Sequence, residues 1–146
     1  MIVPVDTKNI DIAAFIHSFS WQESHRLFCS SGFISLHTPD HQRVYLQEKI
    51  AHGSRLFMLV ESDPIGIVAI TESLIEDLYV LPRYQNHGCG TKLLQFAISQ
   101  CDDIPSLWIL ENNVNAERFY RRNGFRPTGR KNSRNGRLKE IEFSLR

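Results

Sequence analysis

A short glycine-containing segment, Gln85–Gly90, has the residue types of a loop that binds an anion through its backbone. The segment joins a strand-like run ending at Val80-Leu81-Pro82 to a run with helical periodicity that begins near Gly90. The first N–H groups of a helix lack partners inside the helix and carry partial positive charge, so they bind phosphate oxygens. Gly88 and Gly90 let a bulky anion approach the backbone, and Asn86 tolerates positive φ. The spacing therefore predicts a phosphate-binding turn at the start of a helix.

Two other phosphate loops do not fit this segment. The Walker pattern GxxxxGK(S/T) fails because only one residue separates Gly88 from Gly90 ahead of Lys92. The dinucleotide fingerprint GxGxxG fails because Leu93 stands where its third glycine is required. Lys92 would add positive charge in the first helical turn. The alternative is a glycine-rich connection without a ligand, so a second pattern has to decide between them.

That second pattern is a pair of residues, Asn113 and Tyr120, on a segment with helical character. They stand seven residues apart, which on a helix is two turns and places both on one face. A phenol, with an ordinary pKa near 10, can act as a proton donor. The alternatives are that Asn113 only caps the helix and that Tyr120 is a core aromatic beside Phe119.

The two patterns together resemble the acetyl-CoA signature of the GNAT acetyltransferase superfamily. The segment Val80–Gly90 reads V-x-P-x-x-Q-x-x-G-x-G, and Asn113–Phe125 reads N-x-x-A-x-x-x-Y-x-x-x-G-F, in the family's order. The resemblance covers Arg55–Leu145, and residues 1–50 match only in carrying two expected helices. Two departures are a cysteine at Cys89, where the family has an aliphatic residue, and Asn86, where many members have glycine.

The resemblance implies an N-acetyltransferase that moves an acetyl group from acetyl-CoA to a primary amine by direct attack in a ternary complex, without a metal. Backbone amides of the loop would hold the pyrophosphate of CoA, and a strand edge would hydrogen-bond the pantetheine arm. Asn113 would contact the same arm, and Tyr120 would protonate the departing thiolate. The residues expected at the cofactor are Leu78, Tyr79, Val80, Gln85, Asn86, His87, Gly88, Cys89, Gly90, Thr91, Asn113 and Tyr120.

The reaction also needs a base, because an ammonium must lose its proton before it attacks. Glu76 and Asp77 precede the loop on its strand, and we expect Glu76 rather than Asp77 to act. Strict alternation places Glu76 on the face of Leu78 and Val80, whereas a bulge would break that parity. A backbone N–H near Val80 would stabilise the oxyanion.

The elements around these residues indicate an α/β (α+β) fold. With the resemblance, they predict a GNAT-like mixed, mostly antiparallel central sheet of about six to seven strands flanked by about four helices. Residues 20–37 show no sustained periodicity and are not assigned. The expected helices are Ile10–Phe19, a helix from Pro39 to just before Gly53 with Thr38 as its N-cap, Gly90–Gln100 and Asn113–Arg122. The expected strands are Arg55–Glu61, Ile65–Thr71, Leu74–Leu81, Leu107–Leu110, Phe125–Gly129 and Leu138–Leu145.

Length and composition limit the class of protein. The 146 residues, 42% of them hydrophobic, predict one domain over 1–146 that folds without a metal or disulfide. No apolar run approaches the ~20 residues of a membrane span, and no secretory signal is expected. Three widely spaced cysteines, Cys29, Cys89 and Cys101, favour a reducing compartment, so we expect a cytoplasmic protein.

The net charge of +1 hides a strongly basic end: residues 118–146 contain ten Lys or Arg and two Asp or Glu. This block, with the expected hairpin at 130–139, would attract an acidic acceptor, contact CoA phosphates or face solvent. The rival interpretation is a nucleic-acid-binding module, or a CoA-sensing regulatory module without transferase activity. We consider nucleic acid unlikely as a partner because the block lacks interleaved aromatic residues.

The remaining signals are weaker. His37 with His41, and His25 with Cys29, lack further ligands at recognisable spacing, so no metal site is expected. Aromatic residues in the unassigned segment either line an acceptor pocket or fill a core; they are Trp21, Phe28 and Phe33. The acceptor is expected to be a small-molecule amine or a peptide amine. The sequence leaves its identity, and a homodimer, open.

Overall fold

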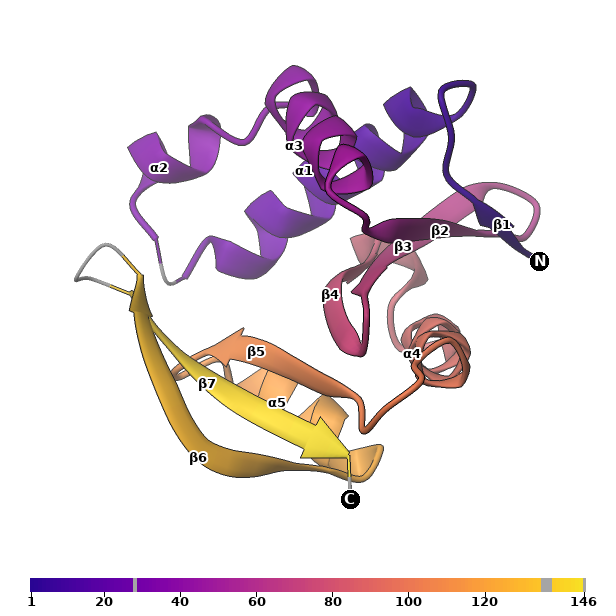
Figure 1. Ribbon diagram of the computed structural model, residues 1–146. Coiled ribbons are helices and arrows are strands. Elements are labelled where there is room, and N and C mark those ends of the chain that lie inside the picture. Colours follow the sequence, from indigo (N-terminus) through magenta and orange to yellow (C-terminus); the bar gives the residue numbers. More distant parts are fainter. Residues whose placement is uncertain (28, 135–137, 146) are drawn as a thin grey trace.

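Seven strands form a single sheet in the order β1-β2-β3-β4-β5-β7-β6 (Figure 1). The computed structural model describes residues 1–27, 29–134 and 138–145. In chain order the elements are β1 Ile2–Pro4, α1 Ile10–His25, α2 Ser31–Ser35, α3 Pro39–Ala51, β2 Arg55–Val60, β3 Pro64–Thr71, β4 Leu74–Val80, a 3₁₀ turn Pro82–Tyr84, α4 Cys89–Ser99, β5 Ser106–Leu110, α5 Val114–Arg122, β6 Phe125–Arg134 and β7 Leu138–Leu145.

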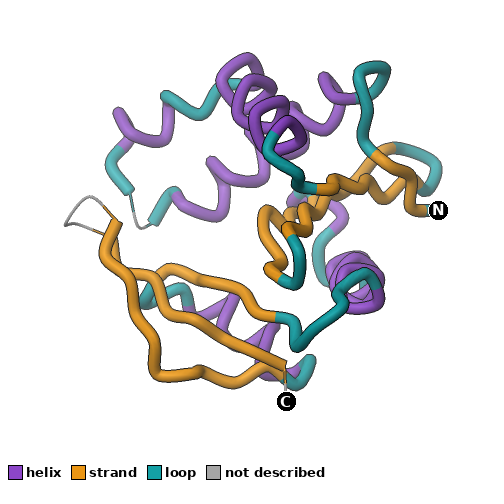
Figure 2. Tube along the Cα trace, viewed as in Figure 1, coloured by secondary structure: helices purple, strands orange, loops and turns teal. Residues whose placement is uncertain are grey.

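The sheet has two halves, β1–β4 and β5-β7-β6, which diverge from each other (Figure 2). Every neighbouring pair is antiparallel except β4 and β5, which are parallel. That parallel pair has one register position, Leu74 opposite Ser106. Beyond Leu74 the two strands separate. The mixed, mostly antiparallel sheet predicted from the sequence is therefore confirmed.

Two clusters of buried side chains cover the two faces of the first half. On one face, α1 and α3 pack on β2 and β3 through side chains that include Ile16, Leu46 and Met58. On the other face, α4 buries the predicted apolar stripe, in which Leu93 and Leu94 are fully buried. Burying a leucine side chain contributes roughly 1.5–3 kcal/mol, so this stripe holds α4 on the sheet. The second cluster continues into β5 and β7, and α5 packs against it.

Local signals in the sequence set several element ends as predicted. The Thr38 side chain accepts a hydrogen bond from the His41 N–H at 3.1 Å, with Pro39 in the first helical position. Residues 53, 88, 124 and 129 are glycines with positive φ at turns or bulges. Of the helices in the described ranges, none combines the length and apolar character needed to cross a membrane.

Three differences from the predicted elements have local causes. Helix α1 continues to His25 rather than ending at Phe19, because its buried face there carries polar residues such as Ser20 that break the apolar pattern. Strand β1 is a three-residue edge strand, and α2 has no buried residue, so neither produces a periodic signal. Helix α2 also makes five α-helices in the described ranges where about four were expected. Strand β6 is longer than expected because a bulge at Gly129 lets the pairing with β7 resume.

Candidate active site

The edge of β4 that faces β5 is open over most of its length. Because β5 pairs only at Leu74, no described strand is paired with Leu78 or Val80 on that side. An open strand edge can hydrogen-bond an extended ligand much as it would another strand. The Gln85 side chain donates to the carbonyl of Val80 at 2.9 Å, which ties the following loop to the end of this strand.

The loop ends at a helix start that no side chain caps. Gly88 is the N-cap of α4 with φ of 84°, and Asn86 also has positive φ, as the sequence suggested. A Cβ added to Gly88 would meet no atom within 4 Å, so this position borders open space. The first N–H groups of α4 are therefore available to an anion. Lys92 lies in the expected turn, but its Nζ pairs with Glu61 at 2.9 Å.

Helix α5 lies against this helix start. A Cβ at Gly90 would be 3.3 Å from the ring of Phe119, so the absence of a side chain at Gly90 permits the contact. Asn113 is the N-cap of α5, and its Oδ1 accepts from the Ala116 N–H at 3.2 Å. The capping alternative for Asn113 is therefore observed. Its contact with a cofactor remains a prediction.

Tyr120 lies on the partly buried side of α5. Its ring packs edge-on against Phe119 and Phe125, with centroids 5.1 and 5.8 Å away. Burial raises the pKa of Tyr120 above its ordinary value, so the phenol is protonated at neutral pH. Its hydroxyl makes no hydrogen bond to any described residue. Tyr120 therefore has a proton to donate.

A bulge in β4 sets which way the two candidate bases point. The register against β3 shifts between Ile67 and Ala69, and Asp77 has φ of 53°. Leu78 and Val80 consequently pack on the α4 face, whereas Glu76 reaches Lys49 of α3 on the opposite face. Strict alternation was therefore wrong for Glu76, and the bulge alternative is correct.

Asp77 is the centre of a hydrogen-bonded network between α1, α3 and β4. Its carboxylate accepts from His17 Nε2 at 2.9 Å, from Lys49 Nζ at 2.7 Å and from the Tyr45 hydroxyl at 3.1 and 3.2 Å. His17 is in turn held by Gln42, whose Nε2 lies 2.6 Å from His17 Nδ1. These donors offset the cost of left-handed backbone at a residue with a side chain.

The network also separates the two acids chemically. Burial by itself would raise the pKa of Asp77, but the hydrogen bond from His17 and the charge of Lys49 outweigh burial and hold the pKa well below its usual range. Burial lowers the pKa of Lys49, yet the charge of Asp77 raises it overall. Glu76 Oε1 accepts from Lys49 Nζ at 2.8 Å and from the Thr71 hydroxyl at 3.3 Å, and none of the described residues bonds to its Oε2. Asp77 is thus an anchor, and Glu76 has the freer carboxylate.

Replacing Asp77 with Asn should cost about 2 kcal/mol of stability at neutral pH, because hydrogen bonds to a buried charge are lost. The folded-state pKa of Asp77 is depressed, so its contribution is fully present above the unfolded value near 4 and is lost as pH falls further. Urea unfolding of both proteins at pH 7, 4 and 3 checks this. A difference in stability that does not shrink below about pH 4 would contradict it.

The weaker sequence signals fall elsewhere. The Trp21 ring stacks on the rings of His25 and His37, with ring centroids 4.0 and 3.6 Å away. Phe33 belongs to the same aromatic cluster. Phe28 and the tip of the basic hairpin at 135–137 lie outside the described residues. Over the described ranges, no group of three or more His, Cys, Asp or Glu is arranged to hold a metal ion.

Part of the basic end is neutralised within the molecule. Arg121 pairs with Glu117 at 2.9 Å, and Arg130 lies 3.4 Å from Glu142. The Arg130 guanidinium also lies over the ring of Trp108, at 5.8 Å. Whether the other basic side chains meet an acceptor, CoA phosphates or solvent remains a prediction.

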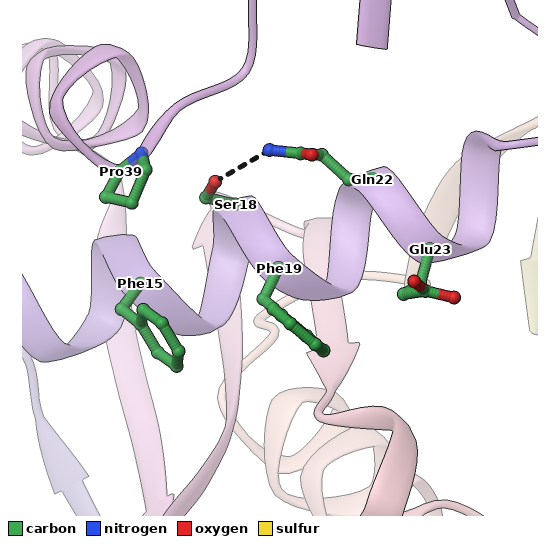
Figure 3. Close-up of a pocket in the computed structure, with 6 residues that line it drawn as sticks. All are labelled: Phe15, Ser18, Phe19, Gln22, Glu23 and Pro39. Carbon is green, nitrogen blue, oxygen red and sulfur yellow. Dashed lines mark hydrogen bonds between the residues drawn. The ribbon is translucent and has the colours of Figure 1, made fainter. Parts of the chain in front are cut away.

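A hollow lies along α1 beside the start of α3 (Figure 3). Phe15 and Phe19 project side by side from α1 with centroids 5.9 Å apart, and Gln22 donates to Ser18 at 3.2 Å. The six lining residues are Phe15, Ser18, Phe19, Gln22, Glu23 and Pro39. None of them belongs to the loop, to β4 or to α5.

Comparison with known proteins agrees with this geometry. Residues 22–139 match a family model described as the acetyltransferase (GNAT) domain. Over 70 residues the chain is 27% identical to a protein named peptidyl-lysine N-acetyltransferase YjaB from Salmonella typhimurium, and the match spans 48% of each chain. The chain thus matches about half the length of that relative.

Two solved structures share the fold. The solution structure of apo YjaB from Escherichia coli has a TM-score of 0.73 at 18% identity, covering 99% of this chain and 96% of that one. The crystal structure of PaiA N-acetyltransferase from Thermoplasma acidophilum in complex with coenzyme A has a TM-score of 0.72 at 17% identity, covering 97% and 96%. Because the family model matches most of its length, the chain belongs to the GNAT acetyltransferase family, a family of acetyl-CoA-dependent acyltransferases.

Proposed function

We propose that residues 1–146 form one N-acetyltransferase domain that transfers an acetyl group from acetyl-CoA to a primary amine in a ternary complex. The observation that carries the proposal is the continuity of three features. The open edge of β4 leads into the uncapped start of α4, α5 contacts that start through Phe119, and the neighbouring Tyr120 packs against the core cluster that contains Val80. An extended ligand with amide groups and a phosphate end fits this arrangement.

The cofactor would lie along this path. Backbone groups of Leu78–Val80 would bond the pantetheine arm, with Asn113 beside it, and the loop Gln85–Thr91 would hold the pyrophosphate. The open space at Gly88 and the positive φ at Asn86 and Gly88 support the loop assignment. Bound acetyl-CoA supplies the activated acetyl group as a thioester.

Two residues, Glu76 and Tyr120, each carry out one proton transfer. Glu76 removes a proton from the acceptor ammonium, directly or through water, so that the amine nitrogen can attack the thioester carbonyl. A backbone N–H near Val80 stabilises the negative charge that develops on the carbonyl oxygen. Tyr120 gives its phenolic proton to the sulfur as the carbon–sulfur bond breaks. The location of Glu76 on the α1–α3 face implies that the acceptor approaches from that face.

The acceptor is proposed to be a primary amine of a small molecule or of a peptide. The Salmonella relative, named for peptidyl-lysine, supports a lysine side chain among the candidates. Neither a membrane nor a metal is required by this proposal. The compartment is proposed to be the cytoplasm, in keeping with the three free cysteines.

A thermal-shift titration tests the proposal. Acetyl-CoA at 100 times its dissociation constant should stabilise the protein by about 2.7 kcal/mol, which raises the melting temperature by several degrees. CoA should act similarly, whereas a plain nucleotide should act weakly because it cannot use the β4 edge. Release of free thiol in the presence of an amine panel then reports transfer. No shift with millimolar acetyl-CoA would contradict cofactor binding, and a shift without thiol release would leave a CoA sensor as the function.

A further inference from the structure

Two consecutive residues of β4, Glu76 and Asp77, bind the same lysine through their carboxylates. In a regular strand, neighbouring side chains project to opposite faces of the sheet. The bulge, where Asp77 has φ of 53°, brings both carboxylates to the face that α3 covers. Lys49 Nζ of α3 donates to Glu76 Oε1 at 2.8 Å and to Asp77 Oδ2 at 2.7 Å. The proposed base and the buried anchor therefore share one ammonium group.

The ammonium of Lys49 is held in place from several sides. The Lys49 side chain is 14% exposed, and the Tyr45 ring lies 5.3 Å from Nζ. Asp77 is itself held by hydrogen bonds from His17 and from the Tyr45 hydroxyl. Burial lowers the pKa of Lys49, but the charge of Asp77 outweighs burial and raises it above its ordinary value. Lys49 is therefore a fixed cation at neutral pH.

The carboxylate of Glu76 is bound through one of its two oxygens. Oε1 accepts from Lys49 and, at 3.3 Å, from the Thr71 hydroxyl, whereas Oε2 has no bond to any described residue. Rotation of the carboxylate about its terminal bond would break both hydrogen bonds, so these donors fix its orientation. The lone pairs of Oε2 remain available to another proton donor.

Glu76 is also the more accessible of the two acids. Its side chain is 33% exposed, against 11% for Asp77. It lines a hollow of about 350 Å³ whose walls come from α3, the end of β3 and β4, and include Glu48 and Thr71. An ammonium group can approach Glu76 through this hollow. Asp77 offsets the charge of Lys49, so the two carboxylates and one ammonium leave a net negative charge that attracts a cation.

We propose that Lys49 is a positioning residue for acetyl transfer, which holds Glu76 by Oε1 so that Oε2 takes the proton of the acceptor ammonium. This assignment rests on the proposed function. The N–H bond of the ammonium breaks, its proton passes to Oε2, and the electron pair stays on nitrogen for the attack on the thioester carbonyl. Asp77 contributes by fixing Lys49 and offsetting its charge.

Steady-state kinetics of Lys49→Met, with spermidine and Nα-acetyl-lysine amide as probe amines, test the assignment. Methionine is of similar length but carries no charge and no donor. The variant should lower kcat about tenfold, because Glu76 loses its orientation, with the affinity for acetyl-CoA within twofold of wild type. Arg43→Met is the matched control on α3, since Arg43 pairs with Asp40 and Asp11 rather than with the acids of β4. Its kcat should stay within twofold of wild type.

A double-mutant cycle distinguishes positioning from a purely structural role. It is measured at pH 9, where about 100 times more of a lysine amine is unprotonated than at pH 7, so that Glu76→Gln retains transfer. In the Glu76→Gln background, Lys49→Met should lower kcat by less than a further twofold, because no base remains to be positioned. A further tenfold fall there would overturn the assignment, as would wild-type kcat for Lys49→Met alone.

A second variant covers the case in which Lys49→Met does not fold, since it leaves the buried charge of Asp77 with fewer donors. Combining Lys49→Met with Asp77→Asn removes both charges of the buried pair. This double variant should show the same tenfold loss of kcat, and wild-type kcat in it would contradict the assignment. Wild-type kcat for Glu76→Gln at pH 7, or absence of transfer by the wild type, would instead overturn the proposed function on which the assignment rests.

Discussion

Tyr120→Phe should lower kcat by about two to three orders of magnitude while leaving the affinity for acetyl-CoA nearly unchanged. The substitution removes only the hydroxyl, and the ring contacts with Phe119 and Phe125 remain. Because burial keeps the phenol protonated, wild-type Tyr120 supplies a proton as the thiolate leaves, and phenylalanine cannot. Pre-steady-state release of CoA, measured alongside acetyl-CoA binding, separates the chemical step from binding.

Tyr84→Phe is the matched control for this prediction. Tyr84 ends the 3₁₀ turn that precedes α4, and its hydroxyl donates to Asp63 at 3.0 Å on the surface. Its removal should change kcat by less than twofold. If Tyr120→Phe retains wild-type kcat, another group or water protonates the thiolate, and the role assigned to Tyr120 is wrong.

Gly88→Leu should weaken acetyl-CoA binding by on the order of 100-fold or more, because its side chain would occupy the open space beside the first N–H groups of α4. Left-handed backbone at a leucine also costs roughly 1–2 kcal/mol, so the melting temperature should fall slightly. Calorimetric titration with acetyl-CoA measures the loss, and circular dichroism verifies that the variant is folded.

Gly53→Leu separates strain from obstruction. Gly53 follows α3, has φ of 102° and likewise has nothing within 4 Å of an added Cβ. Leucine at either position is strained because both glycines have positive φ, so both variants should lose stability, but Gly53→Leu should bind acetyl-CoA like the wild type. Equal binding by Gly88→Leu and wild type would mean that the cofactor phosphates do not use this loop.

Most elements from α3 onward were predictable because their signals are local. Glycine positions, the caps at Thr38 and Asn113, and the stripe around Leu93 each depend on residues within a few positions of one another. The loop Gln85–Gly90 and the motif on α5 could be recognised for the same reason, because each is a short continuous segment. The boundaries of most strands followed from alternation and from turn residues.

The Asp77 network was not predictable, because it joins three elements far apart in the sequence. His17, Tyr45 and Lys49 come from two helices, and no spacing between them marks a common partner. One signal was present: His17 stands among apolar residues on the buried face of α1, where a polar side chain requires a partner. The bulge at Asp77 was likewise not predictable from the alternation of side chains along a strand, because that alternation fails wherever one residue is added.

The single register position between Leu74 and Ser106 also has a mechanical consequence. The backbone fixes the two halves of the sheet at one end, where Ser106 N–H donates to Ser73 at 3.0 Å. Farther along, side-chain packing in the cluster shared by α4, β4, β5 and β7 joins them. Packing is not directional, whereas a hydrogen-bonded ladder is, so the halves can pivot about the Leu74 end without breaking a backbone bond. The angle between β4 and β5 can thus adjust to the thickness of a ligand that lies between them. A ligand hydrogen-bonded to both strands would fix that angle.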